Sequence, residues 1–248
     1  MVVLKHILLV LFFVGSLSAE SITIYSAANL KFFFDDIKKA YLTLHPQDEV
    51  KVKFASSGIL TQDILSAQEY DLFLAANMQY PQKVYESGMA VEKAQLYTTG
   101  SIILLIENHK DLAKKGIGIL NDENIKEITI ANKKTAPYGM AAIEALKNAH
   151  LYEKLKSKII YSSDASDVIG DVLWYGNAGL LPKSAINFLP RGYNIKGENW
   201  IEVDKNLYTP IKQGFVVSKK GDKKEITKRF IHFLLGDCQK IFKENGYK

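Results

Sequence analysis

From about position 21 to its end, the chain alternates two patterns of apolar residues. In one, apolar residues form short runs or alternate with polar ones, and this predicts β-strands. In the other, apolar residues recur every three or four positions, and this predicts amphipathic helices. We expect strands at 21–27, 50–56, 70–76, 101–107, 128–132, 158–163 and 213–219, and helices at 29–46, 59–67, 80–88, 139–155 and 224–247.

This regular succession of strand and helix predicts an α/β architecture with mostly parallel sheets, arranged as one or two lobes. The run SIILLIE at 101–107 shows no alternation, which indicates a strand buried on both faces. Parallel sheets bind ligands beyond the carboxyl ends of their strands, where helices begin. Binding residues are therefore expected where a strand passes into a helix.

Four such junctions carry small residues together with amide or hydroxyl groups. They are Ser26–Asn29, Ala55–Gly58, Ala136–Gly139 and Ser166–Val168, two in each half of the chain. A helix N-terminus offers unpaired backbone N–H groups and about half a unit of positive charge, which suits an anion. Several of them converging on one point could hold an oxyanion without any lysine or arginine.

Each junction taken alone could have a simpler structural role. Ser57 or Asn29 before a helix is more often an N-cap than a ligand. Asp167 is better understood as a cap, because its carboxylate would repel an anion. Tyr138 beside Pro137 could be an ordinary turn residue. The recurrence of one pattern at four places favours binding over these simpler roles.

Ser57 could also be a nucleophile, which would make the protein a secreted serine hydrolase. That chemistry needs a base, and the chain has only five histidines. His150 and His232 fall inside predicted helices, and there is no GxSxG, HExxH or Cys/His cluster. The sequence therefore disfavours hydrolysis and predicts that the protein is not an enzyme.

Composition narrows the class of protein. With 248 residues, 47% of them hydrophobic, the chain can bury one large core or two small ones. The formal charge of +5 is spread along the chain without a basic stripe, so we expect no nucleic-acid partner. The lone Cys238 cannot form an internal disulfide and lies in an apolar helical pattern, which indicates a packed, unreactive thiol.

The first residues follow a different pattern from the rest. Lys5 precedes an apolar run from Ile7 to Val14, and small residues follow it up to Ala19. This is typical of a secretory signal peptide, and the run is too short for a membrane span. We therefore expect residues 1–19 to be a signal peptide and the mature chain to be exported.

Several segments, taken in order and spacing, resemble one known family. They are ITIYSAANL, VKVKFASSG with ILTQDI, YDLFLAAN, TGSIILLI, TAPYGMAAIEAL, AGLLPKSA, YTPIKQGFVV and IFKENGYK. The family is that of the periplasmic molybdate-binding proteins of bacterial ABC importers, which are type II substrate-binding proteins. The resemblance implies two α/β lobes with a ligand cleft between them, lobe 1 at 20–100 and 211–248 and lobe 2 at 101–210.

The resemblance also implies a function. The oxyanion contacts fall on Ala28, Asn29, Ser57, Tyr138 and Val168, with Tyr138 and Val168 offering mainly backbone N–H groups. The ligand would be molybdate, and also tungstate, so that the metal is bound only as its oxyanion and no cofactor is needed. A monomer in the periplasm would deliver this ligand to an ABC permease in the inner membrane. Pro182 stands near the place where one family pattern has a ligand-contacting tyrosine.

Overall fold

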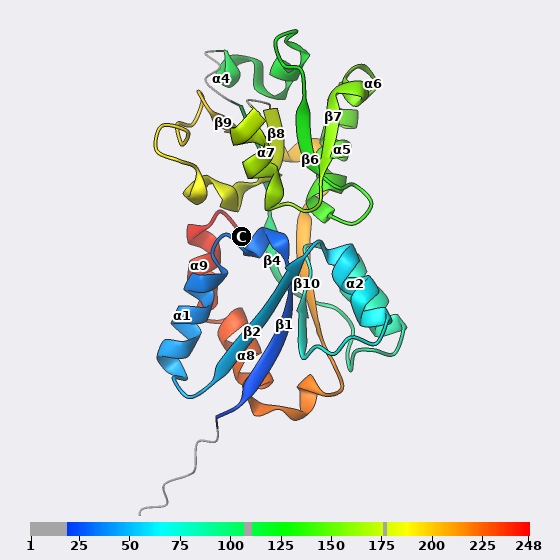
Figure 1. Ribbon diagram of the computed structural model, residues 1–248, viewed down its shortest axis with the longest axis vertical. Helices are drawn as coiled ribbons and strands as arrows, with labels where there is room; N and C mark the ends of the chain where they lie inside the picture. The colour runs from blue at the N-terminus through cyan, green and yellow to red at the C-terminus, as the bar shows by residue number, and fades with distance from the viewer. Residues whose placement is uncertain (1–18, 107–110, 176–177) are drawn as a thin grey trace, which may run out of the picture.

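Two mixed five-stranded sheets form the two lobes of the computed structural model, which describes residues 19–106, 111–175 and 178–248 (Figure 1). The predicted signal peptide at 1–19 lies almost entirely outside these residues. The first sheet has the order β2-β1-β3-β10-β4, with β1 at Ser21–Ala27, β2 at Glu49–Ala55, β3 at Leu72–Leu74, β4 at Gln95–Gly100 and β10 at Ile211–Val217. The second has the order β7-β6-β8-β5-β9, with β5 at Ile102–Leu105, β6 at Ile128–Ala131, β7 at Ile159–Ser162, β8 at Ala178–Pro182 and β9 at Trp200–Glu202.

Each strand expected from the sequence is present, whereas β4, β8 and β9 were not expected. The pairs β1–β2, β1–β3, β6–β7 and β6–β8 are parallel. The pairs of β10 with β3 and β4, and of β5 with β8 and β9, are antiparallel. Antiparallel pairing is therefore as frequent as parallel pairing in the described residues, and every antiparallel pair involves β5 or β10, the first strand after each passage of the chain from one lobe to the other.

Helices cover the faces of both sheets. They are α1 at Phe34–Leu44, α2 at Ser57–Leu65, α3 at Gln79–Glu86, α4 at Leu112–Lys115, α5 at Pro137–Asn148, α6 at Tyr152–Leu155, α7 at Asp167–Tyr175, α8 at Glu225–Leu235 and α9 at Cys238–Glu244. Short 3₁₀ turns lie at Ala28–Leu30, Gly116–Asn121, Lys156–Lys158, Lys183–Phe188, Lys205–Leu207 and Gly221–Lys223.

Three predicted helices differ from the sequence expectation. The first begins at Phe34, because the residues after β1 form a 3₁₀ turn and not an α-helix. The predicted helix at 139–155 is interrupted at His150, whose φ of 56° is left-handed, so His150 was wrongly placed inside a helix. The predicted last helix is two helices, separated at Gly236.

The buried core confirms the sequence pattern at several points. All four residues of β5 are buried, which explains why this strand shows no alternation. Cys238 is buried as well, in agreement with a packed thiol.

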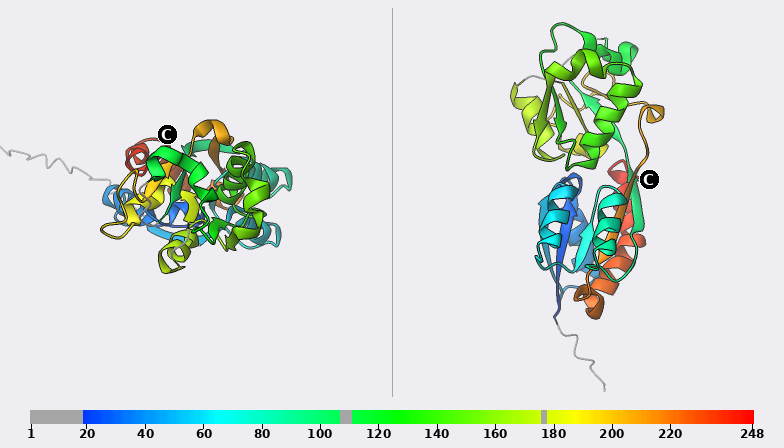
Figure 2. Two further views of the ribbon diagram at one scale, coloured as in Figure 1. Left: turned by 90° about the horizontal axis from the view of Figure 1, so that it is seen from above. Right: turned by 90° about the vertical axis from the view of Figure 1, so that its right-hand side faces the viewer.

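The chain passes between the lobes twice. It crosses first at Ser101, between β4 and β5, and returns between β9 and β10 (Figure 2). The two crossings meet where the backbone N–H of Ile102 donates to the hydroxyl of Tyr208 over 3.2 Å. Strand-to-helix junctions of the two lobes lie opposite each other, where they line a common cavity.

Candidate functional site: an uncharged cavity between the lobes

A small cavity of about 10 Å³ lies where the two lobes meet. Its walls come from the junctions singled out in the sequence: Ala27, Ala28, Asn29, Ser56, Ser57 and Ala76 from lobe 1, and Ala136, Pro137, Tyr138 and Ala165 from lobe 2. None of these side chains is charged. The structure therefore brings Ala28, Asn29, Ser57 and Tyr138 together.

The two serines at the start of α2 do not cap the helix. Ser57 is its first residue, and its Oγ accepts a hydrogen bond from the backbone N–H of Ala76 over 2.9 Å. Ser56 holds the N-cap position, but its side chain makes no capping bond, and its buried Oγ has no partner among the described residues. The predicted capping role of these serines is wrong in this structure.

No histidine of the described residues forms a hydrogen bond with Ser57 Oγ. The hydrogen bond that its Oγ makes in the described part of the chain is the one from Ala76, which leaves the hydroxyl proton free for another acceptor. The site therefore offers a hydrogen-bond donor at Ser57 and not an activated nucleophile.

Asn29 lies in the 3₁₀ turn after β1 and is 1% exposed. Its Nδ2 donates to Gln213 Oε1 over 3.1 Å and to the hydroxyl of Tyr247 over 2.8 Å. Its Oδ1 is buried without a partner among the described residues. Asn29 is thus not a cap but part of a polar network that extends from the cavity toward the crossings between the lobes.

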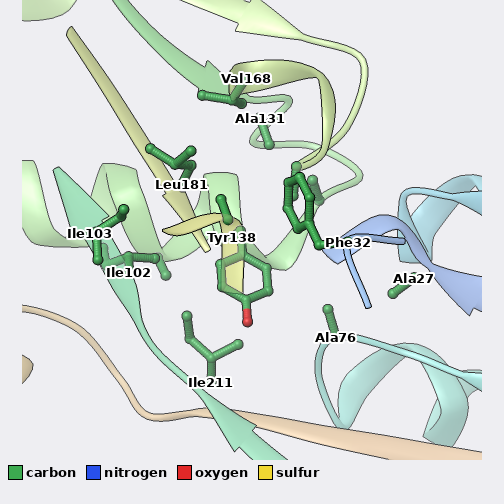
Figure 3. Packing of buried hydrophobic residues seen from close by; sticks show 14 of the residues in the cluster. Ala27, Phe32, Ala76, Ile102, Ile103, Ala131, Tyr138, Val168, Leu181 and Ile211 are labelled. Atoms are coloured by element: carbon green, nitrogen blue, oxygen red, sulfur yellow. The ribbon is translucent and has the colours of Figure 1, made fainter. Parts of the chain in front are cut away.

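Tyr138 follows Pro137 at the start of α5. Its ring points away from Val168 and toward Ile211 (Figure 3), and its hydroxyl accepts a hydrogen bond from Gln213 Nε2 over 3.0 Å. The part of Tyr138 that can face a ligand is therefore its backbone, at a helix start where Pro137 has no N–H to offer.

Val168 is fully buried but does not line the cavity, where Ala165 stands instead. Asp164 holds the backbone of this junction: its Oδ1 accepts hydrogen bonds from the backbone N–H groups of Ser166 and Asp167. Burial raises the pKa of Asp167, and neighbouring Asp164 raises it further, while Lys31 opposes the shift. Asp164, and not Asp167, accepts the backbone N–H groups that begin α7.

Direct contacts hold the lobes together around the cavity. The backbone N–H of Gly58 donates to the carbonyl oxygen of Thr135 over 2.8 Å, and the hydroxyl of Tyr80 donates to the carbonyl oxygen of Lys134 over 3.1 Å. On the other side, Ser184 Oγ donates to the carbonyl oxygen of Asn29 over 3.3 Å. The structure therefore shows the lobes in a closed arrangement.

The small volume of the cavity limits what it can hold in the closed arrangement. A volume of about 10 Å³ is roughly what one water molecule requires, so a larger ligand needs the walls to move apart. Four larger hollows, of about 360, 570, 440 and 350 Å³, lie beside Tyr208, Trp174, Lys38 and Met140, respectively. We assign the site to the small cavity because its lining is uncharged and brings together the strand-to-helix junctions of both lobes.

Metal-binding clusters and membrane-spanning helices are both absent from the described residues. The described residues contain no group of three or more His, Cys, Asp or Glu side chains placed to hold a metal ion. In that same part of the chain, no helix is long and apolar enough to cross a membrane.

Two α/β lobes joined by two crossings and meeting over a ligand cavity define a type II substrate-binding protein. The chain belongs to the family described as bacterial extracellular solute-binding protein, which matches residues 22–248. This family assignment agrees with the expected two-lobed fold.

Individual relatives agree with the family. The chain is 28% identical over 200 residues to the molybdate-binding protein ModA of Rhodobacter capsulatus, covering 80% of this chain and 77% of the relative. It is also 28% identical over 201 residues to ModA of Azotobacter vinelandii, covering 80% and 79%. The solved periplasmic molybdate-binding protein of Azotobacter vinelandii superimposes with a TM-score of 0.82 at 20% identity, covering 92% and 98%. The resemblance inferred from the sequence is confirmed.

Sequence reasoning missed three polar residues near the cavity: Ser184, Gln213 and Tyr247. One signal was available for Gln213, which is a polar residue in an otherwise apolar strand, IKQGFVV. No local pattern distinguishes Ser184 and Tyr247, which only the fold brings to the site.

Proposed function

We propose that the protein is an exported substrate-binding protein that captures molybdate, and also tungstate, and delivers it to an ABC permease in the inner membrane. The observation that carries the proposal is the uncharged cavity where the starts of α2 and α5 face each other across the lobes. Helix starts and hydroxyl groups can hold a doubly charged oxyanion without lysine or arginine.

Buried polar atoms without partners support an oxyanion site. Two buried hydroxyl groups near the cavity have no partner among the described residues. One is Ser56 Oγ, whose residue lines the cavity, and the other is Thr135 Oγ1, whose residue directly precedes the lining residue Ala136. A buried hydroxyl that lacks a partner costs about 1–3 kcal/mol. Both hydroxyls can donate, so an oxyanion that accepted from them would remove this cost.

Neutral hydrogen-bond donors can supply the free energy that binds the oxyanion. Each hydrogen bond to a charged oxygen contributes about 1.5–3 kcal/mol, so a few donors suffice to hold the anion once it is desolvated. The contacts from both lobes favour the closed arrangement, which is the form that the permease would recognise. The proposed contacts are Ala28, Asn29, Ser57, Tyr138 and Val168, of which Val168 requires the start of α7 to approach the cavity.

Selectivity would come from size. Sulfate has shorter bonds to oxygen than molybdate and would leave some donors unmet, at about 1–3 kcal/mol each. Tungstate is too similar to molybdate for this argument to separate them. No cofactor is required, and the metal enters only as its oxyanion. We further propose that the protein acts in the periplasm as a monomer and has no catalytic role, as its family of solute-binding proteins supports.

Isothermal titration calorimetry with molybdate, tungstate, sulfate and phosphate tests the proposal. We expect heat with molybdate and tungstate and much weaker binding of sulfate and phosphate. Ser57→Ala should weaken the binding, and Ser87→Ala, which removes a lobe 1 hydroxyl bonded to Val84, is the matched control. Binding of sulfate or phosphate without any response to molybdate or tungstate would overturn the proposal.

A further inference from the structure

A closed hydrogen-bonded network lies behind Asn29, on the side away from the cavity. Gln213 Oε1 accepts from Asn29 Nδ2 over 3.1 Å and from the hydroxyl of Tyr97 over 2.8 Å. Gln213 Nε2 donates to the hydroxyl of Tyr138 over 3.0 Å. Asn29, Gln213, Tyr97, Tyr138 and Tyr247 are all 5% exposed or less, so bulk solvent does not reach their polar atoms.

In this arrangement the network presents the wrong end of Asn29 to an anion. Both protons of Nδ2 are engaged by Gln213 and Tyr247, which leaves Oδ1 as the end of this cavity-lining side chain that has no partner among the described residues. A carbonyl oxygen carries partial negative charge and can only accept hydrogen bonds. It would repel an oxyanion held beside it.

Turning both amide groups by 180° reverses this situation and preserves the network. Asn29 Oδ1 then accepts from Gln213 Nε2 and from the hydroxyl of Tyr247, and Gln213 Oε1 accepts from the hydroxyl of Tyr138. The second proton of Gln213 Nε2 goes to the oxygen of Tyr97, whose own proton goes to the carbonyl oxygen of Ala75, 3.3 Å away. Nitrogen and oxygen exchange places at nearly unchanged positions, so each of the contacts just named has one donor and one acceptor.

The tyrosines suit both arrangements because they keep their protons. Burial raises the pKa of the hydroxyls of Tyr97, Tyr138 and Tyr247 above the ordinary value. Each hydroxyl can therefore donate or accept as the amides require. In the reversed arrangement no acceptor of Asn29 is orphaned, and its Nδ2 is free to donate into the cavity.

We propose that Gln213 is a positioning residue of the oxyanion site, because the orientation of its amide decides whether Asn29 presents an acceptor or a donor to the ligand. The inference rests on the proposed function. Oxyanion binding selects the arrangement in which both amides are turned, and Gln213 itself never touches the ligand.

Two substitutions separate this role from a structural one. Gln213→Glu introduces a carboxylate that only accepts, so it holds Asn29 Nδ2 on its own side and turns Oδ1 toward the cavity. We expect molybdate affinity to fall more than a hundredfold at pH 8 and to recover as the buried carboxyl is protonated near pH 5, where it can donate. Gln213→Met removes the partner without a charge and should weaken binding by about tenfold without this pH dependence. The parent protein should show a flat profile over the same range.

Gln239→Met is the matched control, because Gln239 also donates two hydrogen bonds near the crossings, to the carbonyl oxygens of Tyr97 and Leu234, but none toward Asn29. It should change thermal stability and leave affinity unchanged. A direct readout needs no variant: in ¹⁵N spectra of the parent, the side-chain amide signals of both Asn29 and Gln213 should shift when molybdate is added.

The outcomes distinguish the two proposals. If molybdate binds to the parent but the Gln213 amide signals do not move, or if both folded Gln213 variants bind as tightly as the parent, the positioning role is wrong and the proposed function stands. If the parent binds no molybdate or tungstate at all, the proposed function itself fails.

Discussion

The backbone N–H of Gly58 donates to the carbonyl oxygen of Thr135 over 2.8 Å and so joins the start of α2 in lobe 1 to the residues before α5 in lobe 2. This close approach is possible because Gly58 has no side chain. A Cβ at this position would lie 2.9 Å from Thr135 Cα and 2.8 Å from the hydroxyl of Tyr80. The closed arrangement thus depends on a glycine beside Ser57.

Gly58→Ala should therefore impair closure more than folding. An overpacked contact costs about 1–3 kcal/mol, so we expect oxyanion affinity to fall roughly tenfold. The thermal stability of the ligand-free protein should stay equal or rise slightly, because alanine favours helix. Calorimetry measures the affinity, and small-angle scattering with saturating molybdate measures the closure of the lobes. Gly170→Ala, in α7 with open space around it, is the control, and equal affinity of Gly58→Ala and the parent would contradict the prediction.

Arg229 links the last part of the chain to its beginning. It contacts Glu20 over 3.1 Å and Asp48 over 2.9 Å, and the fully buried side chain of Asp48 also accepts a hydrogen bond from the hydroxyl of Tyr41. Arg229→Met should lower the free energy of unfolding by about 2 kcal/mol, less than the loss of a fully buried pair because Arg229 is 31% exposed.

Urea denaturation measures this change. Lys228→Met removes only an exposed pair with Glu225 and should have no measurable effect. Equal losses in the two variants would show that the contact with Asp48 contributes nothing.

Cys238 should be unreactive in the folded protein. Burial raises the pKa of its thiol from 9.0 to about 12, so the thiolate that reacts with disulfide reagents is scarce at pH 8. We expect Ellman's reagent to label the protein only after denaturation in urea. Rapid labelling of one thiol per folded molecule would contradict this.

The same shift in the pKa of Cys238 makes stability depend on pH in the alkaline range. The unfolded chain releases the thiol proton above about pH 9 and the folded chain only near pH 12, so stability is complete below pH 9 and is lost as pH rises from 9 to 12. Cys238→Ala should show a shallower loss of stability between pH 9 and 10. An unchanged slope in this variant would assign the alkaline loss to other groups.

His150 is a place where the sequence departs from local preference. It follows α5 with a φ of 56°, a conformation that costs an ordinary residue about 1–2 kcal/mol and glycine almost nothing. His150→Gly should raise the free energy of unfolding by up to about 1 kcal/mol, since the relief of strain exceeds the freedom that glycine gains in the unfolded chain. His150→Ala keeps the strain and should bring no gain. A stabilisation by alanine equal to that by glycine would mean that strain is not the cause.

The sequence by itself determined the alternation of strands and helices, apart from β4, β8 and β9, and the four junctions between them. Both are local: apolar periodicity over a few residues decides strand or helix, and a junction needs only small and polar residues beside a helix start. The resemblance of the ordered segments then indicated the family, which the match over residues 22–248 confirms.

Only the tertiary structure decided what each junction residue does. Asn29 and Gln213 are 184 residues apart and Asn29 and Tyr247 are 218 apart, yet they share hydrogen bonds at the site. No short pattern can predict such contacts, because they depend on two chain crossings and on how the lobes meet. For the same reason, the sequence left both a cap and a ligand contact open for Ser57, whereas the fold brings the N–H of Ala76 to its hydroxyl and leaves the starts of α2 and α5 facing a common cavity.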